Sequence, residues 1–186
     1  DINKFIQIIP PTNGNDAEDV AHDHGDNSQG QSRVEVGRAA AHRNPGLNPI
    51  GRLDKDTTGL LLMTDDGKLL HKIIHPKSNC LKVYHVVLDR PLEGHEGELF
   101  SSGTLVLNSE TKPLLPAKLE VLGEKEAHVT LHEGRYHQVR RMFAAAGNHV
   151  LELKRVSIGG LKLPDDLEEG DWRPLDEEEL AAVFAG

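Results

Sequence analysis

A polar loop that runs directly into an apolar segment constrains the fold of this 186-residue chain more than any other stretch. The loop is Gly51-Arg-Leu-Asp-Lys-Asp-Thr-Thr-Gly-Leu60, and it continues into the apolar residues Leu60 to Met63. A short apolar run bounded by a glycine and by Asp65-Asp66-Gly67 is typical of a buried strand. The loop therefore presents two carboxylates, Asp54 and Asp56, at the mouth of a strand that is anchored in the core.

Short strands are predicted to outnumber helices in the rest of the chain. Apolar alternation rich in valine predicts strands over residues 82–88, 104–107, 117–122, 127–131 and 149–156. A further strand is predicted before Pro10-Pro11, a turn over residues 44–49, and short edge strands over 161–163 and 172–175. Helical spacing of apolar residues and capping signals predict helices over 68–75, 94–102, 136–146 and 176–185. This order of elements indicates an antiparallel-rich α+β domain.

The acidic charge of the chain is concentrated at its C-terminal end. The formal net charge is −9, but residues 164–186 alone carry nine acidic residues and one arginine. Residues 51–163 carry 16 basic and 14 acidic residues, a small positive excess. The central region can therefore present a basic face to a nucleic acid in spite of the acidic total.

The expected cellular compartment follows from the single cysteine and from the lack of a membrane span or signal peptide in the sequence. A single cysteine, Cys80, excludes an intramolecular disulfide and fits a reducing environment. No apolar stretch approaches the roughly 20 residues of a membrane span, and no signal peptide opens the sequence. Residues 13–31 are almost without apolar side chains and predict a flexible loop. We expect a soluble cytoplasmic protein.

Three features of the central region are suited to act in one site: the loop carboxylates, the hydroxyl of Tyr84, and a guanidinium cluster of Arg135, Arg140 and Arg141. A nucleophilic carboxylate must stay ionised, and a guanidinium within ion-pair reach favours the ionised form. A tyrosine ring offers a flat face for a base and a hydroxyl for proton transfer. The residues alone thus indicate a cofactor-free site for an anionic, nucleic-acid substrate. It is equally compatible with them that Asp54 and Asp56 only bond backbone groups of a turn.

Metal and glycosidase interpretations are weaker. Two histidine pairs have spacings that could bind a metal. His22/His24 lacks a second ligand pair, and the helix of His71/His75 carries Lys72 where a zinc protease would have a glutamate. Asp54 and Asp56 could bind magnesium, but no third acid stands at a recognisable spacing. Paired carboxylates also serve glycosidases, yet two on one loop are poorly placed to flank a glycosidic bond. No metal or cofactor is predicted.

Three motifs together resemble the RsuA/RluB group of RNA pseudouridine synthases. They are the loop and strand from Gly51 to Gly67, Lys82-Val-Tyr84, and Glu133-Gly-Arg-Tyr-His-Gln-Val-Arg-Arg-Met142. The resemblance runs from about Leu47 to the C-terminus, and Thr111-Lys-Pro-Leu-Leu-Pro-Ala-Lys-Leu119 is most similar to the small-subunit ribosomal RNA branch. It implies a mixed, mainly antiparallel sheet flanked by a few helices around a central catalytic cleft.

The resemblance implies an isomerase that breaks the base–sugar bond of a uridine, turns the base, and joins its carbon 5 to the sugar. By position, Asp54 would be the catalytic aspartate and Arg140 its basic partner. Tyr84 would stack on the base and assist proton removal from carbon 5, and Leu153 would line the pocket. Asp56 would be structural. Candidate RNA contacts are Arg52, Arg135, Arg141, Lys154 and Arg155.

The N-terminal segment departs from the pattern of the group. Members normally carry a small N-terminal RNA-binding domain, and residues 1–50 are too short and polar to be one. We therefore expect a divergent, partly flexible segment over residues 1–46 and a catalytic domain over 47–186. The expected partner is ribosomal RNA or a pre-ribosomal particle, bound by a monomer without a membrane. The alternative is a catalytically silent RNA-binding or ribosome-assembly protein on the same fold.

Overall fold

A computed structural model describes residues 4–9, 48–54, 56–78, 80–168 and 172–185. The strands are β1 (Lys4–Ile9), β2 (Asn48–Ile50), β3 (Thr57–Thr64), β4 (Lys82–Leu88), β5 (Lys118–Gly123), β6 (Glu126–Leu131), β7 (Val150–Ile158), β8 (Leu161–Lys162) and β9 (Trp172–Pro174). The helices are α2 (Gly67–Ile74), the 3₁₀ turn η1 (Pro76–Ser78), α3 (Glu96–Ser101), α4 (Gln138–Ala145) and α5 (Glu177–Val183).

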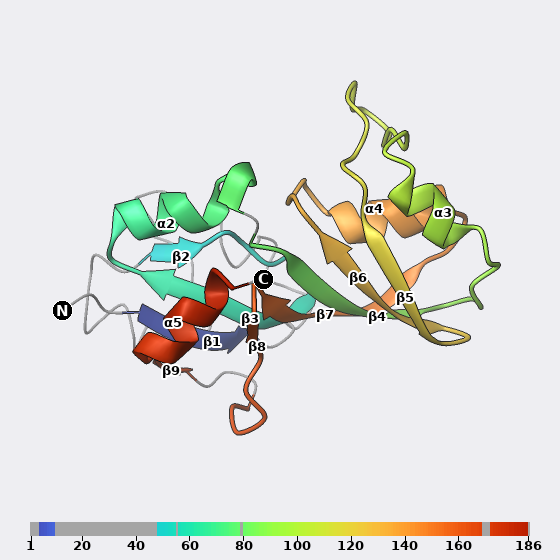
Figure 1. Ribbon diagram of the computed structural model, residues 1–186. Helices are drawn as coiled ribbons and strands as arrows, with labels where there is room; N and C mark the ends of the chain where they lie inside the picture. The colour runs from blue at the N-terminus through green and yellow to red at the C-terminus, as the bar shows by residue number, and fades with distance from the viewer. Residues whose placement is uncertain (1–3, 10–47, 55, 79, 169–171, 186) are drawn as a thin grey trace, which may run out of the picture.

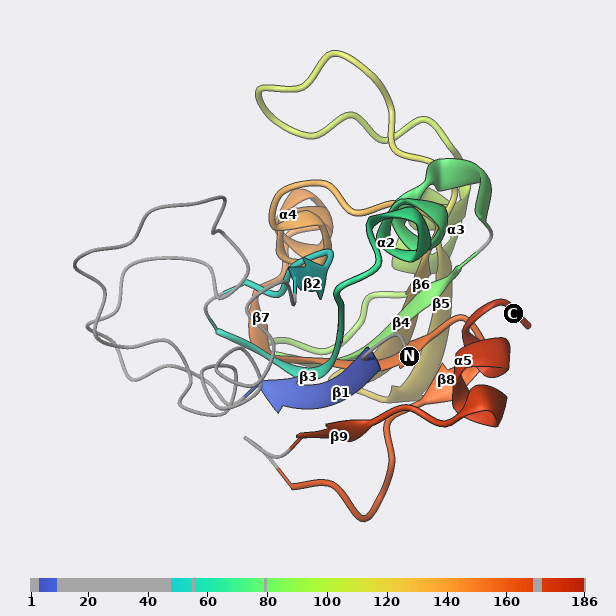
Figure 2. The ribbon, with the colours of Figure 1, turned by 90° about the vertical axis from the view of Figure 1, so that its left-hand side faces the viewer.

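One mixed sheet runs through the described structure in the order β5-β6-β4-β7-β3-β1-β9 (Figure 1). β3 and β7 are parallel, and the other pairings are antiparallel. Helices α2 and α4 lie over the same face of the sheet, one above each half, and α5 lies on the opposite side (Figures 1 and 2). The α+β class with a mixed, mainly antiparallel sheet is confirmed.

β3 lies next to the middle strand β7 and is buried along almost its whole length, because residues of α2 and α5 pack against it. Along one edge it pairs with β1, and along the other it pairs with β7 at Thr57–Gly59 and with β2 at Leu62–Thr64. This explains its continuous apolar run, since a strand covered on both faces has no solvent side to alternate with. The strand is longer than the predicted apolar run, because it begins at Thr57.

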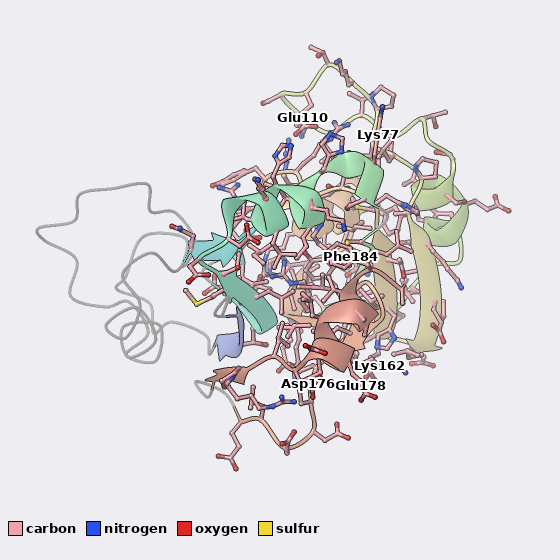
Figure 3. The ribbon with its side chains drawn as sticks, turned by 60° about the vertical axis from the view of Figure 1, so that its left-hand side comes forward. Lys77, Glu110, Lys162, Asp176, Glu178 and Phe184 are labelled. Atoms are coloured by element: carbon pink, nitrogen blue, oxygen red, sulfur yellow. The ribbon has the colours of Figure 1, made fainter. Side chains whose placement is uncertain are left out.

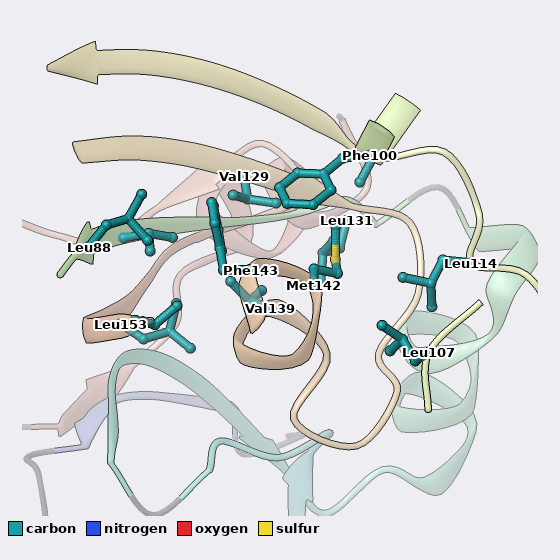
Figure 4. Close-up of a cluster of buried hydrophobic side chains, with 13 residues drawn as sticks. Leu88, Phe100, Leu107, Leu114, Val129, Leu131, Val139, Met142, Phe143 and Leu153 are labelled. Carbon is teal, nitrogen blue, oxygen red and sulfur yellow. The ribbon is translucent and has the colours of Figure 1, made fainter. Parts of the chain in front are cut away.

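Two hydrophobic clusters hold the halves of the sheet to their helices. In one of them, Phe100 of α3 and Phe143 of α4 meet edge to face, with ring centroids 5.1 Å apart, above strands β4, β6 and β7 (Figure 4). The other cluster joins β3 to α2 and α5 through Leu60, Ile73 and Val183. The pocket described below opens between α2 and α4.

The helix ends follow the expected capping chemistry. Asp66 caps α2, and its Oδ1 accepts from the backbone N–H of Lys68 at 3.0 Å. Gly147 follows α4 with a φ of 85°, as predicted for a left-handed cap. Asp176 begins α5 with a capping box that Glu179 completes.

Most of the predicted elements are confirmed, and two predictions are wrong. Residues 104–107 form no strand, because this part of the long α3–β5 connection has no neighbouring strand with which to pair. Residues 48–50, predicted as the end of a turn, instead pair with β3 as β2. The predicted flexible loop over 13–31, with the His22/His24 pair inside it, falls outside the described residues.

Candidate active site

Six of the nine predicted site residues line one cavity of about 640 Å³. It is bounded by the Gly51–Asp54 loop, α2, the pocket face of the sheet and the start of α4. The six are Asp54, Tyr84, Arg52, Arg135, Leu153 and Arg155. Arg140, Arg141 and Lys154 do not line it. A cavity of this size is typical of a small-molecule or nucleotide site.

The loop holds Asp54 at the edge of the cavity. Leu53 is 2% exposed and anchors the loop in the core, while the carbonyl of Asp54 accepts a hydrogen bond of 2.9 Å from the N–H of Thr57. The side chain of Asp54 is 18% exposed, so it is partly shielded but open to a ligand. Asp56 is exposed and does not line the cavity. The two carboxylates of the loop are therefore not equivalent.

The strand register brings the floor of the cavity together. Tyr84 pairs with Arg155, and Thr57 on β3 pairs with Leu153 on β7. Residues two apart on a strand share a face, so Leu153 and Arg155 both face the cavity. The tyrosine and leucine predicted to hold a base thus lie side by side on the same sheet face as Thr57.

The guanidinium of Arg140 contacts the backbone of the loop. Its Nη2 donates to the carbonyl of Asp56 at 3.1 Å and its Nη1 donates to the carbonyl of Val150 at 3.3 Å. No ion pair between Arg140 and Asp54 is recorded among the described residues, and the recorded hydrogen bonds of its guanidinium go to carbonyl oxygens. Arg140 thus fixes the C-terminal end of the loop to β7.

A histidine does lie near Asp54. His137 Nε2 lies 3.6 Å from Asp54 Oδ1 and would be charged only when protonated. His137 adopts a left-handed conformation, with φ 48° and ψ 36°, immediately before α4. Its ring stacks on Tyr136 with centroids 3.8 Å apart, and the guanidinium of Arg52 lies 5.2 Å from the Tyr136 ring centroid.

Arg135 and Arg141, two of the candidate RNA contacts, share one carboxylate. Arg135 Nη1 donates to Glu110 Oε2 at 2.6 Å and Arg141 Nη1 donates to Glu110 Oε1 at 2.9 Å. Arg135 also donates to the carboxylate of Glu133 and to the carbonyls of Lys112 and Pro113. These hydrogen bonds lower the pKa of Glu110 and raise the pKa of Arg135. Both guanidiniums thus tie the α3–β5 connection to the start of α4.

The other candidate RNA contacts differ in their surroundings. Lys154 pairs with His85 of β4, on the sheet face opposite the cavity. Arg155 is 1% exposed, so it is a buried group and not a surface contact. Its Nε donates to the carbonyl of Leu60 at 2.8 Å, and its Nη1 donates to the carbonyl of Arg52 at 3.4 Å.

Several polar residues in or beside the cavity were not predicted as site residues. Thr57, Lys82 and Gln138 line the cavity, and His137 adjoins Asp54. Lys82 could have been found, because a residue two before Tyr84 on a strand shares its face. The position of His137 depends on its left-handed backbone, which no pattern in the sequence indicates.

The described residues contain no group of three or more His, Cys, Asp and Glu side chains that could hold a metal ion. His71 and His75 meet edge to face on α2, with ring centroids 5.6 Å apart, and both are exposed. No described helix has the length and apolar character needed to cross a bilayer.

Comparison with known proteins identifies the class of this fold and site. The model of a family described as RNA pseudouridylate synthase matches residues 16–145. The chain belongs to this family. The match begins at residue 16, whereas the motifs placed the start of the resemblance at about Leu47.

Within the family, the chain is similar to proteins named ribosomal small subunit pseudouridine synthase A, which confirms the predicted branch. It is 51% identical over 137 residues to the Escherichia coli K12 protein, covering 74% of this chain and 59% of that relative. It is 50% identical over 138 residues to the protein of Vibrio cholerae, with the same coverage of each. The chain thus spans about three-fifths of the length of these curated relatives.

Solved structures give the same fold. A crystal structure described as a pseudouridylate synthase superposes with a TM-score of 0.83 at 38% identity, covering 98% of this chain and 74% of that one. The archaeal box H/ACA complex of Nop10 and Cbf5 superposes with a TM-score of 0.57 at 13% identity, covering 90% of this chain and 51% of that one. The second likeness concerns the fold alone.

Proposed function

We propose that this chain isomerises a specific uridine to pseudouridine in small-subunit ribosomal RNA. The observation that carries the proposal is that Asp54 and Tyr84, from two separate motifs, face one cavity large enough for a nucleotide. The names of the relatives support the choice of RNA. We extend the proposal to residues 47–186 as the catalytic domain, to a cytoplasmic monomer, and to ribosomal RNA or a pre-ribosomal particle as its partner.

Asp54 acts as the nucleophile in the proposed reaction. A carboxylate oxygen attacks C1′ of the ribose, and the electron pair of the N1–C1′ bond leaves with the uracil. After the base has turned, C5 bonds to C1′ and the carboxylate departs with its electron pair. C5 loses a proton and N1 gains one, so the product is an isomer of the substrate.

The floor of the cavity orients the base in this proposal. The ring of Tyr84 stacks on the uracil, and its hydroxyl assists removal of the C5 proton. Leu153, 5% exposed beside it, closes the apolar side of the floor. The target nucleotide must leave its stack to reach Asp54, which favours a loop or distorted helix in the RNA.

Asp54→Asn and Asp56→Asn form a matched pair of variants on one loop. Asp54→Asn should abolish tritium release from RNA containing 5-tritiated uridine, because the amide cannot act as the nucleophile. Asp56→Asn should retain most of the activity, since its side chain lies outside the cavity. Tritium release by folded Asp54→Asn at the wild-type rate would overturn the assignment.

One observation favours the alternative of a catalytically silent RNA-binding protein. Arg140 donates to the carbonyls of Asp56 and Val150, and Arg135 and Arg141 are engaged by Glu110, so none of the three provides the expected ion pair with Asp54. RNA binding without pseudouridine formation, under conditions where a full-length relative is active, would support that alternative.

A further inference from the structure

Arg155 is a buried cation that lacks an acidic partner among the described residues. Its side chain is 1% exposed, and two of its nitrogens donate to backbone carbonyls. Its third nitrogen, Nη2, is buried without a hydrogen-bond partner in the structure. A buried polar group without a partner is costly, so such a group at a cavity wall indicates a ligand that supplies the partner.

Lys82 places a second positive charge at the same wall. It lines the cavity, and the structure records no ion pair between Lys82 and a carboxylate of the described residues. Burial and then the charge of Arg155 lower the pKa of Lys82, while the Cys80 thiol opposes this in part. The charge of Arg155 therefore disfavours the ammonium form of Lys82 until an anion lies beside them.

Both cations lie next to Tyr84, on whose ring the uracil is proposed to stack. Lys82 is two residues before Tyr84 on β4, and Arg155 is the partner of Tyr84 on β7. Thr57, on the same face of β3, is 1% exposed, and its Oγ1 also lacks a hydrogen-bond partner in the structure. Two buried polar atoms without a partner, Arg155 Nη2 and Thr57 Oγ1, and the ammonium group of Lys82 thus lie around Tyr84.

We propose that Lys82, with Arg155 beside it, binds the uracil oxygen that becomes negatively charged when the N1–C1′ bond breaks. The inference rests on the proposed function, because it assigns a role in that reaction. The electron pair from the broken bond is shared between N1 and the ring oxygens O2 and O4. The cations stabilise this anion until C5 bonds to C1′ and N1 is protonated. No further reactant is needed.

The position of the cations favours the base over an RNA phosphate. Arg155 is almost fully buried on the sheet floor, next to the ring of Tyr84, whereas a phosphate remains attached to a backbone that follows the surface. Fixed donors at the place where charge develops also contribute most to rate in a shielded site. Binding of a phosphate is therefore the competing outcome of the test.

The first experiment compares Lys82→Met with Lys118→Met, an exposed lysine of β5. At saturating protein, Lys82→Met should slow single-turnover cleavage of the N1–C1′ bond about 100-fold, as expected for loss of one such donor, with Kd for the RNA nearly unchanged. Lys118→Met should be unaffected. With 5-fluorouridine at the target position the defect should shrink, because fluorine already stabilises the uracil anion. Equal defects for both bases, or a defect in Kd alone, would overturn the proposal.

The second experiment does not require turnover. The pKa of Lys82, followed by NMR on the full chain, should rise when RNA containing the target uridine binds, because a bound oxygen with negative character favours the ammonium form. The same RNA with an abasic target site keeps its phosphates and should produce no rise. An equal rise with both RNAs would assign the site to a phosphate and overturn the proposal. A base-dependent rise in a protein that forms no pseudouridine would retain this site and reject the proposed function.

Discussion

Gly59 and Arg155 face each other across the parallel pair of β3 and β7, so closely that a Cβ on Gly59 would lie 2.2 Å from the carbonyl oxygen of Arg155. The φ of Gly59 is 112°, which side chains rarely adopt. Gly59→Ala should therefore destabilise the fold by about 3 kcal/mol, because both the contact and the backbone must shift. Denaturant unfolding followed by circular dichroism measures this.

Gly67→Ala is the matched control for that substitution. Gly67 begins α2, and a Cβ there would meet nothing within 4 Å. Alanine should leave stability unchanged or raise it by up to about 1 kcal/mol, since glycine is the poorer helix residue. Equal losses for the two variants would contradict the close approach of β3 to β7.

Glu110 should make stability depend on pH. Its two arginine partners hold the pKa of this carboxyl below the ordinary 4.5, so its contribution is complete above about pH 4.5 and is lost as the pH falls through the lowered value. The difference in unfolding free energy between wild type and Glu110→Gln should thus shrink in acid. Glu110 lies on the long α3–β5 connection, at the top of the view in Figure 3.

An exposed acid provides the comparison for Glu110. Glu124 lies in the turn between β5 and β6, and no ion pair is recorded for it among the described residues. Glu124→Gln should differ little from wild type at any pH. A Glu110→Gln difference that stays constant from neutral to acid pH would show that the carboxylate contributes nothing through its charge.

Arg140→Ala should slow the reaction without shifting the acid limb of its pH–rate profile. The guanidinium bonds the carbonyls of Asp56 and Val150, so its removal loosens the loop but leaves the environment of the Asp54 carboxylate nearly unchanged. The pH dependence of single-turnover pseudouridine formation measures both effects. A shift of the acid limb to higher pH would instead mean that Arg140 pairs with Asp54 once RNA is bound.

The cap of α5 should contribute measurably to stability. Asp176 Oδ1 accepts from the N–H of Glu179 at 2.8 Å, and Glu179 in turn binds Arg173 through both carboxylate oxygens. Asp176→Ala should cost about 1 kcal/mol in denaturant unfolding. Glu178→Ala, at an exposed position of the same helix (Figure 3), should stay within about 0.5 kcal/mol. Similar effects of the two would argue against the capping box.

Local sequence patterns predicted the helices and strands well, but they predicted the contacts between side chains poorly. The Leu60–Met63 run and the caps at Asp66 and Gly147 depend on neighbouring residues, so they could be read from the sequence. It was also predictable that Asp54 and Tyr84 lie in one cavity, because each belongs to a motif of the resembled family. Side-chain partners depend on positions far apart in the chain.

The arginines illustrate that limit. The sequence shows that Arg140 is charged, but it does not show where the guanidinium points. In the fold, the position of α4 beside the loop directs this guanidinium to backbone carbonyls. The sequence likewise gives Arg155 as one more cation beside Lys154, although alternation on β7 buries one of them and turns the other to the opposite face. Glu110, more than twenty residues before Arg135 and Arg141 in the chain, could not be expected to hold them.

The place of β1 between β3 and β9 has a consequence for how the chain reaches its native state. Synthesis produces β1 early, but one edge of this strand has no partner until Trp172–Pro174 emerges. Pairing between such distant segments is slow, and an open strand edge invites association with other chains in the meantime. We expect the sheet to be completed only after translation of the C-terminal segment, so ribosome-bound chains ending before β9 should be the most prone to aggregate.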